Sequence, residues 1–407
     1  MSEKRDKNKP ELLAPAGNFE KLKWAVEYGA DAVYFGGKFS LRSFAGDFSD
    51  EVVQDCVNYL HARGKKGYVT LNCYPFSDEY DEIRKTARKY DEIGVDAFIV
   101  ADLGVLFELK KLNLNAAIHI STQANTLSLQ TVRAYQELGA ARVNLARELS
   151  LEQIQSIQAA LAGSGIETEV FVHGAVCFSY SGRCAISDYL TGRRANRGEC
   201  THPCRWKYSV VEEERPGEYH PVFEDERGLY LFNSKDLALF EYIPELMRAG
   251  VDSFKVEGRM KSIHYIGSVV SLYRQIIDGK ALSKERIEEL LARVKNRGYS
   301  TGFIKGSVTP DDYQLGDNHS GSSATFVGNV LGENEIYNGS RLFRVRNKVH
   351  AGEALEVLKP DGSVEQIQLP HPLFDDAGRE LEFANNEQKV AIGEQLPEFT
   401  ILRRLNK

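Results

Sequence analysis

The 407-residue sequence contains no run of about 18 consecutive apolar residues, the length that would indicate a membrane-spanning helix. Its charged N-terminus, MSEKRDKNKPELL, lacks the apolar segment of a secretory signal. Six cysteines are too few and too unevenly placed for a disulfide framework in a chain of this length. We therefore expect a cytoplasmic protein without a membrane partner. Its cysteines are expected to bind a metal or take part in catalysis, except Cys56 and Cys73, which taken alone are expected to be buried apolar side chains.

Two sequence patterns of hydrolases are also absent. The chain has neither the H-E-x-x-H of zinc proteases nor the G-x-S-x-G of serine hydrolases. A cysteine nucleophile activated by His173 or His202 stays an alternative. The net charge of -7 argues against a nucleic-acid partner, although a local basic patch can override the overall sign.

What the sequence does contain is a repeated unit in which a helical pattern ends at a glycine and a β-rich run follows. The copies are YGADAVYFGG from Tyr28, IGVDAFIVAD from Ile93, LGAARVNLAR from Leu138 and AGVDSFKVEG from Ala249. Further apolar runs lie at 11–17, 67–72, 116–122 and 168–174. Strands with continuous apolar character that alternate with helices predict a TIM-type (β/α)8 barrel, with a doubly wound open sheet as the alternative.

The spacing of these units also predicts a domain organisation. The eighth strand lies unusually far from the seventh, so a cysteine-containing insertion is expected after strand 7, over 175–235. The segment TPDDYQLGDNHSGSS reads as a linker, because it is polar and rich in turn formers. Short alternating strands follow it. We expect a flexible N-terminus (1–10), a barrel domain (11–308), a linker (309–323) and a small all-β domain (324–407).

Catalytic side chains of such barrels lie at the C-terminal ends of the strands. Cationic residues follow two of the predicted strands, with Arg147 after one and Arg259 and Lys261 after another. Guanidinium groups bind carboxylates through two parallel hydrogen bonds, so this mouth could hold a small anionic molecule. The alternative is that the arginines pair with Glu148 and Glu257.

Four of the six cysteines gather in the predicted insertion. Cys177, Cys184, Cys200 and Cys204 follow the spacing C-x6-C-x15-C-x3-C. Four thiolates can hold a tetrahedral zinc ion or an iron-sulfur cluster. The C-x2-C pairs usual in zinc sites are missing, which favours a [4Fe-4S] cluster.

The same insertion is locally basic on an acidic protein. Its cations between positions 183 and 207 are Arg183, Arg193, Arg194, Arg197, Arg205 and Lys207. They face only Asp188 and Glu199 in this stretch, so phosphates could bind along it, with nearby aromatic residues stacking on bases. The alternative is a solvated loop whose arginines pair with acids nearby.

The run EVFVHGAVCFSYSGRCAIS, at 169–187, resembles the signature of the U32 peptidase family. The resemblance extends from ELLAPAGN through VEGRMKS into the C-terminal strands and so covers nearly the whole chain. It implies a barrel-like catalytic domain and, as in the RNA-modifying members, a [4Fe-4S] cluster held by the four insertion cysteines.

Among the branches of this family, the chain looks most like the proteins that use prephenate to convert the wobble uridine of tRNA into 5-hydroxyuridine. This resemblance implies tRNA as partner and a small dicarboxylate as hydroxyl donor, and it leaves open whether a paralogous subunit is needed. Arg147 and Arg259 are then expected to act on the donor, and His119 and His173 become candidates for proton transfer. Proteolysis, the activity behind the family's name, stays the alternative.

Overall fold

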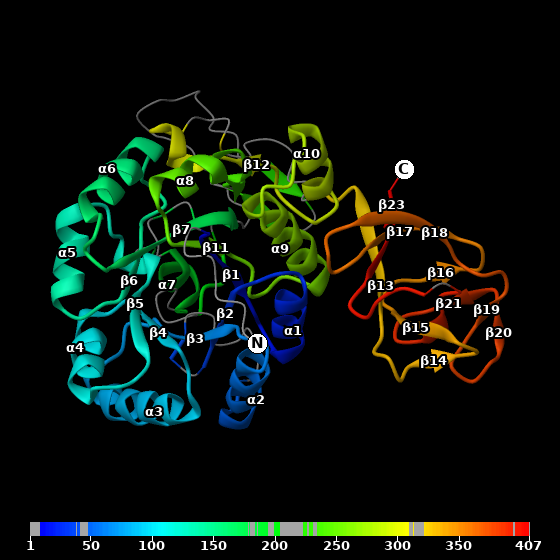
Figure 1. The fold of residues 1–407 in the computed structure, drawn as a ribbon, viewed down its shortest axis with the longest axis horizontal. Helices are drawn as coiled ribbons and strands as arrows, with labels where there is room; N and C mark the ends of the chain where they lie inside the picture. The colour runs from blue at the N-terminus through cyan, green and yellow to red at the C-terminus, as the bar shows by residue number, and fades with distance from the viewer. Residues whose placement is uncertain are drawn as a thin grey trace. The chain divides into compact units, whose positions relative to one another are not determined.

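The computed structural model describes residues 9–406 apart from 38, 41–47, 178, 180–183, 185, 194–198, 204–222, 226–227, 231–233, 309–311, 313–320 and 394. The chain forms two compact units (Figure 1). The first comprises Met1–Val26, Ala30–Met260 and Arg297–Ser320. The second comprises Glu27–Gly29, Lys261–Asn296 and Gly321–Lys407.

The first unit is built on a closed barrel of eight parallel strands, which confirms the TIM-type prediction and rules out the open sheet. Each strand pairs with the next along the chain, and β11 pairs with both β7 and β1 to close the ring. The strands are β1 (Glu11–Pro15), β2 (Ala32–Gly36), β3 (Lys66–Leu71), β4 (Ala97–Val100), β5 (Ala117–Ile120), β6 (Arg142–Asn144), β7 (Glu167–Gly174) and β11 (Ser253–Val256).

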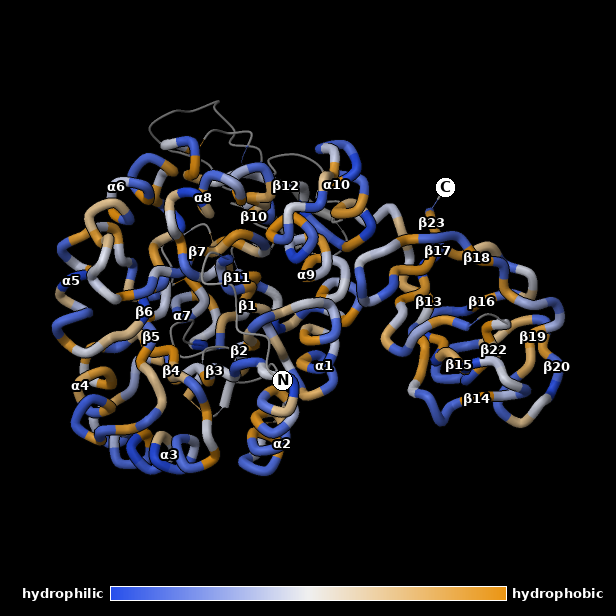
Figure 2. Tube along the Cα trace, in the orientation of Figure 1, coloured by the Kyte–Doolittle hydropathy of each residue, from blue (hydrophilic) through white to orange (hydrophobic). Residues whose placement is uncertain are grey.

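Helices connect these strands and surround them (Figure 1). They are α1 (Phe19–Glu27), α2 (Asp50–His61), α3 (Tyr80–Ile93), α4 (Leu103–Leu112), α5 (Leu129–Glu137), α6 (Leu151–Leu161) and α8 (Ile243–Ala249). The next helix, α9 (Ile263–Ile277), belongs to the second unit. The glycines of the repeated unit, Gly29, Gly94, Gly139 and Gly250, have φ of 101°, 94°, 99° and 88°. This left-handed conformation ends a helix at little cost only for glycine, which explains the repeat. Along outer helices such as α3, hydrophilic and hydrophobic residues alternate (Figure 2).

Short elements at the end of β7 modify the barrel. After β7 the chain forms α7 (Ile186–Thr191) and the antiparallel pair β8 (Phe223–Asp225) and β9 (Gly228–Tyr230). It then returns as β10 (Asp236–Ala238), which runs antiparallel to the last residues of β7, with Leu237 opposite Gly174. A further strand, β12 (Tyr299–Ser300), pairs with β10. The chain therefore leaves the barrel at the end of β7 and returns to it on β10, directly beside the point where it left.

The second unit combines helices with an all-β domain. Its helices are α9 and α10 (Lys284–Ala292), and its largest sheet has the order β14-β15-β13-β23-β17-β18, with β22 beside β15. The strands are β13 (Ala324–Val330), β14 (Ile336–Tyr337), β15 (Ser340–Val345), β16 (Val349–His350), β17 (Ala354–Leu358), β18 (Val364–Gln368), β19 (Leu373–Phe374), β20 (Glu380–Leu381), β21 (Phe383–Ala384), β22 (Lys389–Ala391) and β23 (Ile401–Leu405). The predicted all-β domain is thus confirmed.

Buried polar contacts join the helices of the second unit to its sheet. The buried Glu356 carboxylate accepts hydrogen bonds from Arg293 Nε at 3.1 Å and Arg403 Nε at 2.7 Å. The Tyr28 hydroxyl donates to the carbonyls of Leu358 and Phe399. No helix in the described part of the chain is long and apolar enough to cross a bilayer.

Candidate active site

Charged side chains from β1, β6, β7 and β11 form a hydrogen-bonded network inside the barrel. Arg142 Nη1 donates to Glu11 Oε1 at 2.6 Å and to Glu169 Oε2 at 3.3 Å. On the far side of Glu169, Lys255 Nζ donates to Oε1 at 2.8 Å. The Tyr68 hydroxyl completes the set by donating to Glu11 Oε2. Arg142 also donates from Nε and Nη2 to the partly exposed Glu167 carboxylate, so three carboxylates surround the two cations of this interior network.

His119 lies beside this network on β5. Its ring is buried and meets the Tyr68 ring edge to face at 4.8 Å between centroids. Burial, reinforced by the Arg142 and Lys255 cations, holds the pKa of His119 well below its usual range. Its Nδ1 has no hydrogen-bond partner among the described atoms. This environment favours the neutral imidazole, which can form hydrogen bonds but takes up a proton only with difficulty.

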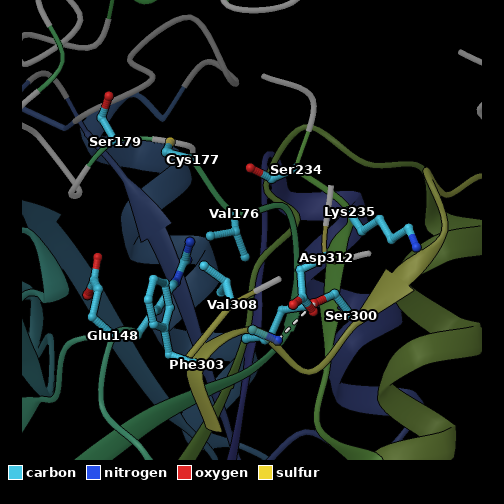
Figure 3. Close-up of a pocket in the computed structure, with 13 residues that line it drawn as sticks. Glu148, Val176, Cys177, Ser179, Ser234, Lys235, Ser300, Phe303, Val308 and Asp312 are labelled. Atoms are coloured by element: carbon cyan, nitrogen blue, oxygen red, sulfur yellow. Dashed lines mark hydrogen bonds between the residues drawn. The ribbon is translucent and has the colours of Figure 1, made fainter. Parts of the chain in front are cut away.

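A pocket of about 470 Å³ opens at the C-terminal ends of β6 and β7 (Figure 3). Its lining combines apolar side chains with charged and hydroxyl-bearing ones, and Cys177, Ser179 and Ser234 from the two ends of the insertion lie at its rim. Residues that follow β12 supply the opposite wall. The lining residues are Arg147, Glu148, Val176, Cys177, Ser179, Ser234, Lys235, Leu237, Ser300, Gly302, Phe303, Val308 and Asp312.

Arg147 is a predicted substrate-binding cation that lines this pocket. Its guanidinium carbon lies 4.0 Å from the centre of the Phe171 ring, and Nη1 donates to the Ala175 carbonyl at 3.1 Å. Its buried Nε has no hydrogen-bond partner among the described atoms. Arg147 forms no ion pair with a described carboxylate, so the predicted alternative of a pair with Glu148 is not seen. A cation placed in this way can still bind an anionic ligand.

The other predicted cations lie elsewhere. Arg259 is buried, and its Nη1 donates to the hydroxyls of Ser40 and Thr70, which follow β2 and end β3. It is not among the residues that line the pocket. Lys261 belongs to the second unit, where its ammonium lies 5.0 Å from the centre of the Tyr265 ring. Of the two predicted cations in the first unit, Arg147 lines the pocket and Arg259 does not.

His173 is the last residue but one of β7, beside the start of the insertion. It is 1% exposed, and its ring lies 5.4 Å from that of Tyr299. Other polar strand ends form local contacts. Gln123 accepts a hydrogen bond from the Asn72 amide, and Asp102 caps α4 by accepting from Val105 N.

Three of the four insertion cysteines lie within the described residues. Cys177 is exposed, and Cys184 and Cys200 are half-buried. The Cys200 sulfur accepts a hydrogen bond from the His202 backbone N–H at 3.4 Å, a contact that stabilises a thiolate. No three His, Cys, Asp or Glu side chains of the described ranges lie close enough together to hold a metal. Cys204 falls outside those ranges, so the four-cysteine set stays a prediction.

The basic strip is described only in part. Arg193 is exposed just after α7, and Tyr189 on that helix is 88% exposed. Arg194 and Arg197 lie outside the described residues.

Sequence reasoning missed the buried network and one wall of the pocket. Glu11, Arg142, Glu169 and Lys255 each stand as a charged residue inside an apolar strand, and that exception to the pattern could have marked them. Phe303 and Val308 carry no comparable mark, because they follow the barrel in sequence and reach the mouth only through the pairing of β12 with β10.

Comparison with known proteins places this architecture in a family. Residues 17–313 match the model of peptidase family U32, and residues 322–403 match the model of its C-terminal domain. A relative from Escherichia coli strain K12, named tRNA hydroxylation protein P, is 37% identical over 88% of this chain and 87% of its own. A Bacillus subtilis strain 168 relative, tRNA hydroxylation protein P1, is 36% identical over 94% of this chain and 91% of its own. A Porphyromonas gingivalis relative named collagenase is 30% identical over 84% of each chain. The chain belongs to peptidase family U32.

Proposed function

We propose that this protein hydroxylates the wobble uridine of tRNA to 5-hydroxyuridine, with prephenate as the hydroxyl donor. The observation that carries the proposal is the similarity, over about nine-tenths of both chains, to two relatives named tRNA hydroxylation proteins. The same family contains a relative named collagenase, so the geometry of the site has to favour one chemistry over the other.

The pocket supports a small anionic substrate. Arg147 presents a guanidinium that has no carboxylate partner among the described residues. Val176, Leu237 and Phe303 provide an apolar surface around it, which suits a ring that bears a carboxylate. Prephenate has both features. Arg147 is the residue that would orient it by one of its two carboxylates.

A [4Fe-4S] cluster on Cys177, Cys184, Cys200 and Cys204 is part of the proposal. The donor set fits the group in kind, because all four residues supply sulfur and Cys200 already accepts a backbone N–H. When bound, such a cluster can exchange electrons with a substrate nearby. Cys177 lies at the rim of the pocket, so the cluster would be adjacent to the donor.

The tRNA would approach from the insertion. Arg193 and Tyr189 are both exposed there, and the sequence adds Arg194 and Arg197. Phosphates bound by these arginines would bring the anticodon to the barrel mouth, where a base turned out of its stack could meet the donor.

Proteolysis finds less support in the site. None of the nucleophilic side chains at the pocket rim, Cys177, Ser179 and Ser234, is hydrogen-bonded to a histidine among the described residues. A cysteine or serine protease needs such a base.

The decisive experiment is mass spectrometry of tRNA nucleosides from a strain that lacks the gene. We expect 5-hydroxyuridine derivatives to disappear and the wild-type gene to restore them. The Arg147→Gln variant should restore them poorly, whereas Arg133→Gln, at an exposed position on α5, should match the wild type. Unchanged nucleosides in the deletion strain, together with cleavage of gelatin by the purified protein, would support the peptidase instead.

A further inference from the structure

The Phe171 ring, on β7, lies close to two cations. The Arg147 guanidinium carbon lies 4.0 Å from its centre, and Lys255 Nζ lies 5.3 Å from it. The ring is buried, so both contacts are shielded from water. The faces of an aromatic ring carry negative charge and attract cations, most strongly where water is excluded.

Lys255 is fixed independently of this contact. It is the direct neighbour of Phe171 across the parallel pairing of β11 with β7. Its ammonium is bound to Glu169 at 2.8 Å and lies 4.5 Å from the Tyr34 ring centre. The ring of Phe171 therefore rests on a part of the barrel that the interior network already holds in place.

Fewer contacts hold the Arg147 side chain in place than hold Lys255. Apart from the Phe171 ring, its one hydrogen bond among the described residues goes to the Ala175 carbonyl, and it has no ion pair there. A long guanidinium side chain with one hydrogen bond would lose considerable rotamer freedom on binding a ligand. Stacking on a rigid ring removes that freedom in advance.

We propose that Phe171 is a positioning residue, which keeps Arg147 aimed into the pocket before an anionic ligand arrives. The inference rests on the proposed function only in that the pocket takes an anion. A leucine would fill most of the same volume but has no negatively charged face. Tyrosine and tryptophan side chains keep a negatively charged ring face and differ from phenylalanine at the ring edge.

The test compares Phe171→Leu with Phe171→Tyr and with Phe254→Leu as a matched control. Phe254 precedes Lys255 on β11, points to the other side of the strand and is fully buried. The first readout needs no ligand. It is the ¹⁵N relaxation of the Arg147 Nε–Hε group in the full-length protein, assigned by its loss in Arg147→Lys. The second is prephenate binding by isothermal titration calorimetry, with KM and kcat of tRNA hydroxylation.

We expect Phe171→Leu to make the Arg147 Nε–Hε group more mobile, and Phe171→Tyr and Phe254→Leu to leave it as in the wild type. Prephenate affinity should fall about threefold to tenfold in Phe171→Leu, with KM raised and kcat changed less than about twofold. Unchanged Arg147 mobility in Phe171→Leu, or an equal loss in Phe254→Leu, would overturn the inference. A wild-type protein that binds no prephenate would instead contradict the proposed donor, and the relaxation measurement would still decide the role of Phe171.

Discussion

Arg142 and Glu11 meet inside the barrel with their Nη1 and Oε1 atoms 2.6 Å apart, and the two side chains are only 2% and 1% exposed. Such a pair gains little over an apolar core, but the loss of one partner leaves a buried charge uncompensated. We expect Arg142→Met to lower the free energy of unfolding by about 3 to 5 kcal/mol in urea titrations. Arg346→Met breaks the more exposed pair with Glu387 and should cost about 0 to 1 kcal/mol. Equal losses in the two variants would show that the interior network is not specially dependent on Arg142.

The position of Arg259 can be tested through a glycine. A Cβ atom at Gly36 would lie 2.5 Å from Arg259 Nη1 and 2.5 Å from Ser40 Oγ. Gly36→Ala should therefore displace Arg259 and, like Arg259→Lys, lower tRNA hydroxylation about tenfold, the effect of losing roughly one charge-assisted hydrogen bond. Gly321→Ala, with no atom within 4 Å, is the control. Wild-type activity in both Gly36→Ala and Arg259→Lys would assign Arg259 a purely structural role.

His264 on α9 should make stability depend on pH. Burial lowers the pKa of this histidine from its usual 6.5 to about 3, and its ring stacks on Phe326. Below pH 6.5 the unfolded chain binds a proton that the folded protein excludes, so stability falls as the pH drops from about 6.5 toward 3.

The matching variant is His264→Phe, which keeps a stacked ring and removes the titration. Between pH 7 and pH 5 the wild type should lose up to about 2 kcal/mol more unfolding free energy than the variant. Parallel pH profiles in urea denaturation would contradict this assignment.

The insertion cysteines should carry iron. We expect anaerobically purified protein to contain about four irons per chain, and Cys177→Ala or Cys204→Ala to lose them. Cys56→Ala should keep them, because burial raises the pKa of the Cys56 thiol to about 12 and keeps it protonated inside the barrel domain. Iron and acid-labile sulfide analyses decide the matter. Stoichiometric zinc without acid-labile sulfide would show that the cysteines hold a zinc ion and not an iron-sulfur cluster.

Binding to tRNA should depend steeply on salt. Each phosphate contact releases counterions, so the affinity measured by fluorescence anisotropy should fall as salt rises from 50 to 200 mM. The double variant Arg193→Ala with Arg194→Ala should bind more weakly and show a shallower salt slope at unchanged iron content. A tRNA affinity that does not change with salt concentration would argue for a small-molecule or peptide substrate.

The barrel could be predicted because four of its eight strands follow the same helix-ending glycine pattern. Gly29, Gly94, Gly139 and Gly250 end helices in the left-handed conformation, and an apolar strand follows each of them. The candidate site could be predicted only in outline. Arg147 was found by its place after a strand, but the hydroxyl partners of Arg259 could not be inferred, because Ser40 and Thr70 belong to other units.

The pocket wall escaped prediction for a related reason. The strands β10 and β12 have three and two residues, too few to show any periodicity in the sequence. Their pairing nevertheless decides which residues face Arg147. Sequence patterns report long elements well, whereas contacts among short ones depend on the assembled fold.

The antiparallel pairing of β10 with β7 also has an engineering consequence. Because Gly174 and Leu237 are direct partners in the ladder, the two ends of the intervening segment are already adjacent. A short turn could in principle join them, and the segment of a relative could be grafted in its place without moving a barrel strand. The part of the chain that carries the cysteines and arginines thus leaves and rejoins the barrel at one place, which makes it a unit that can be exchanged as a whole.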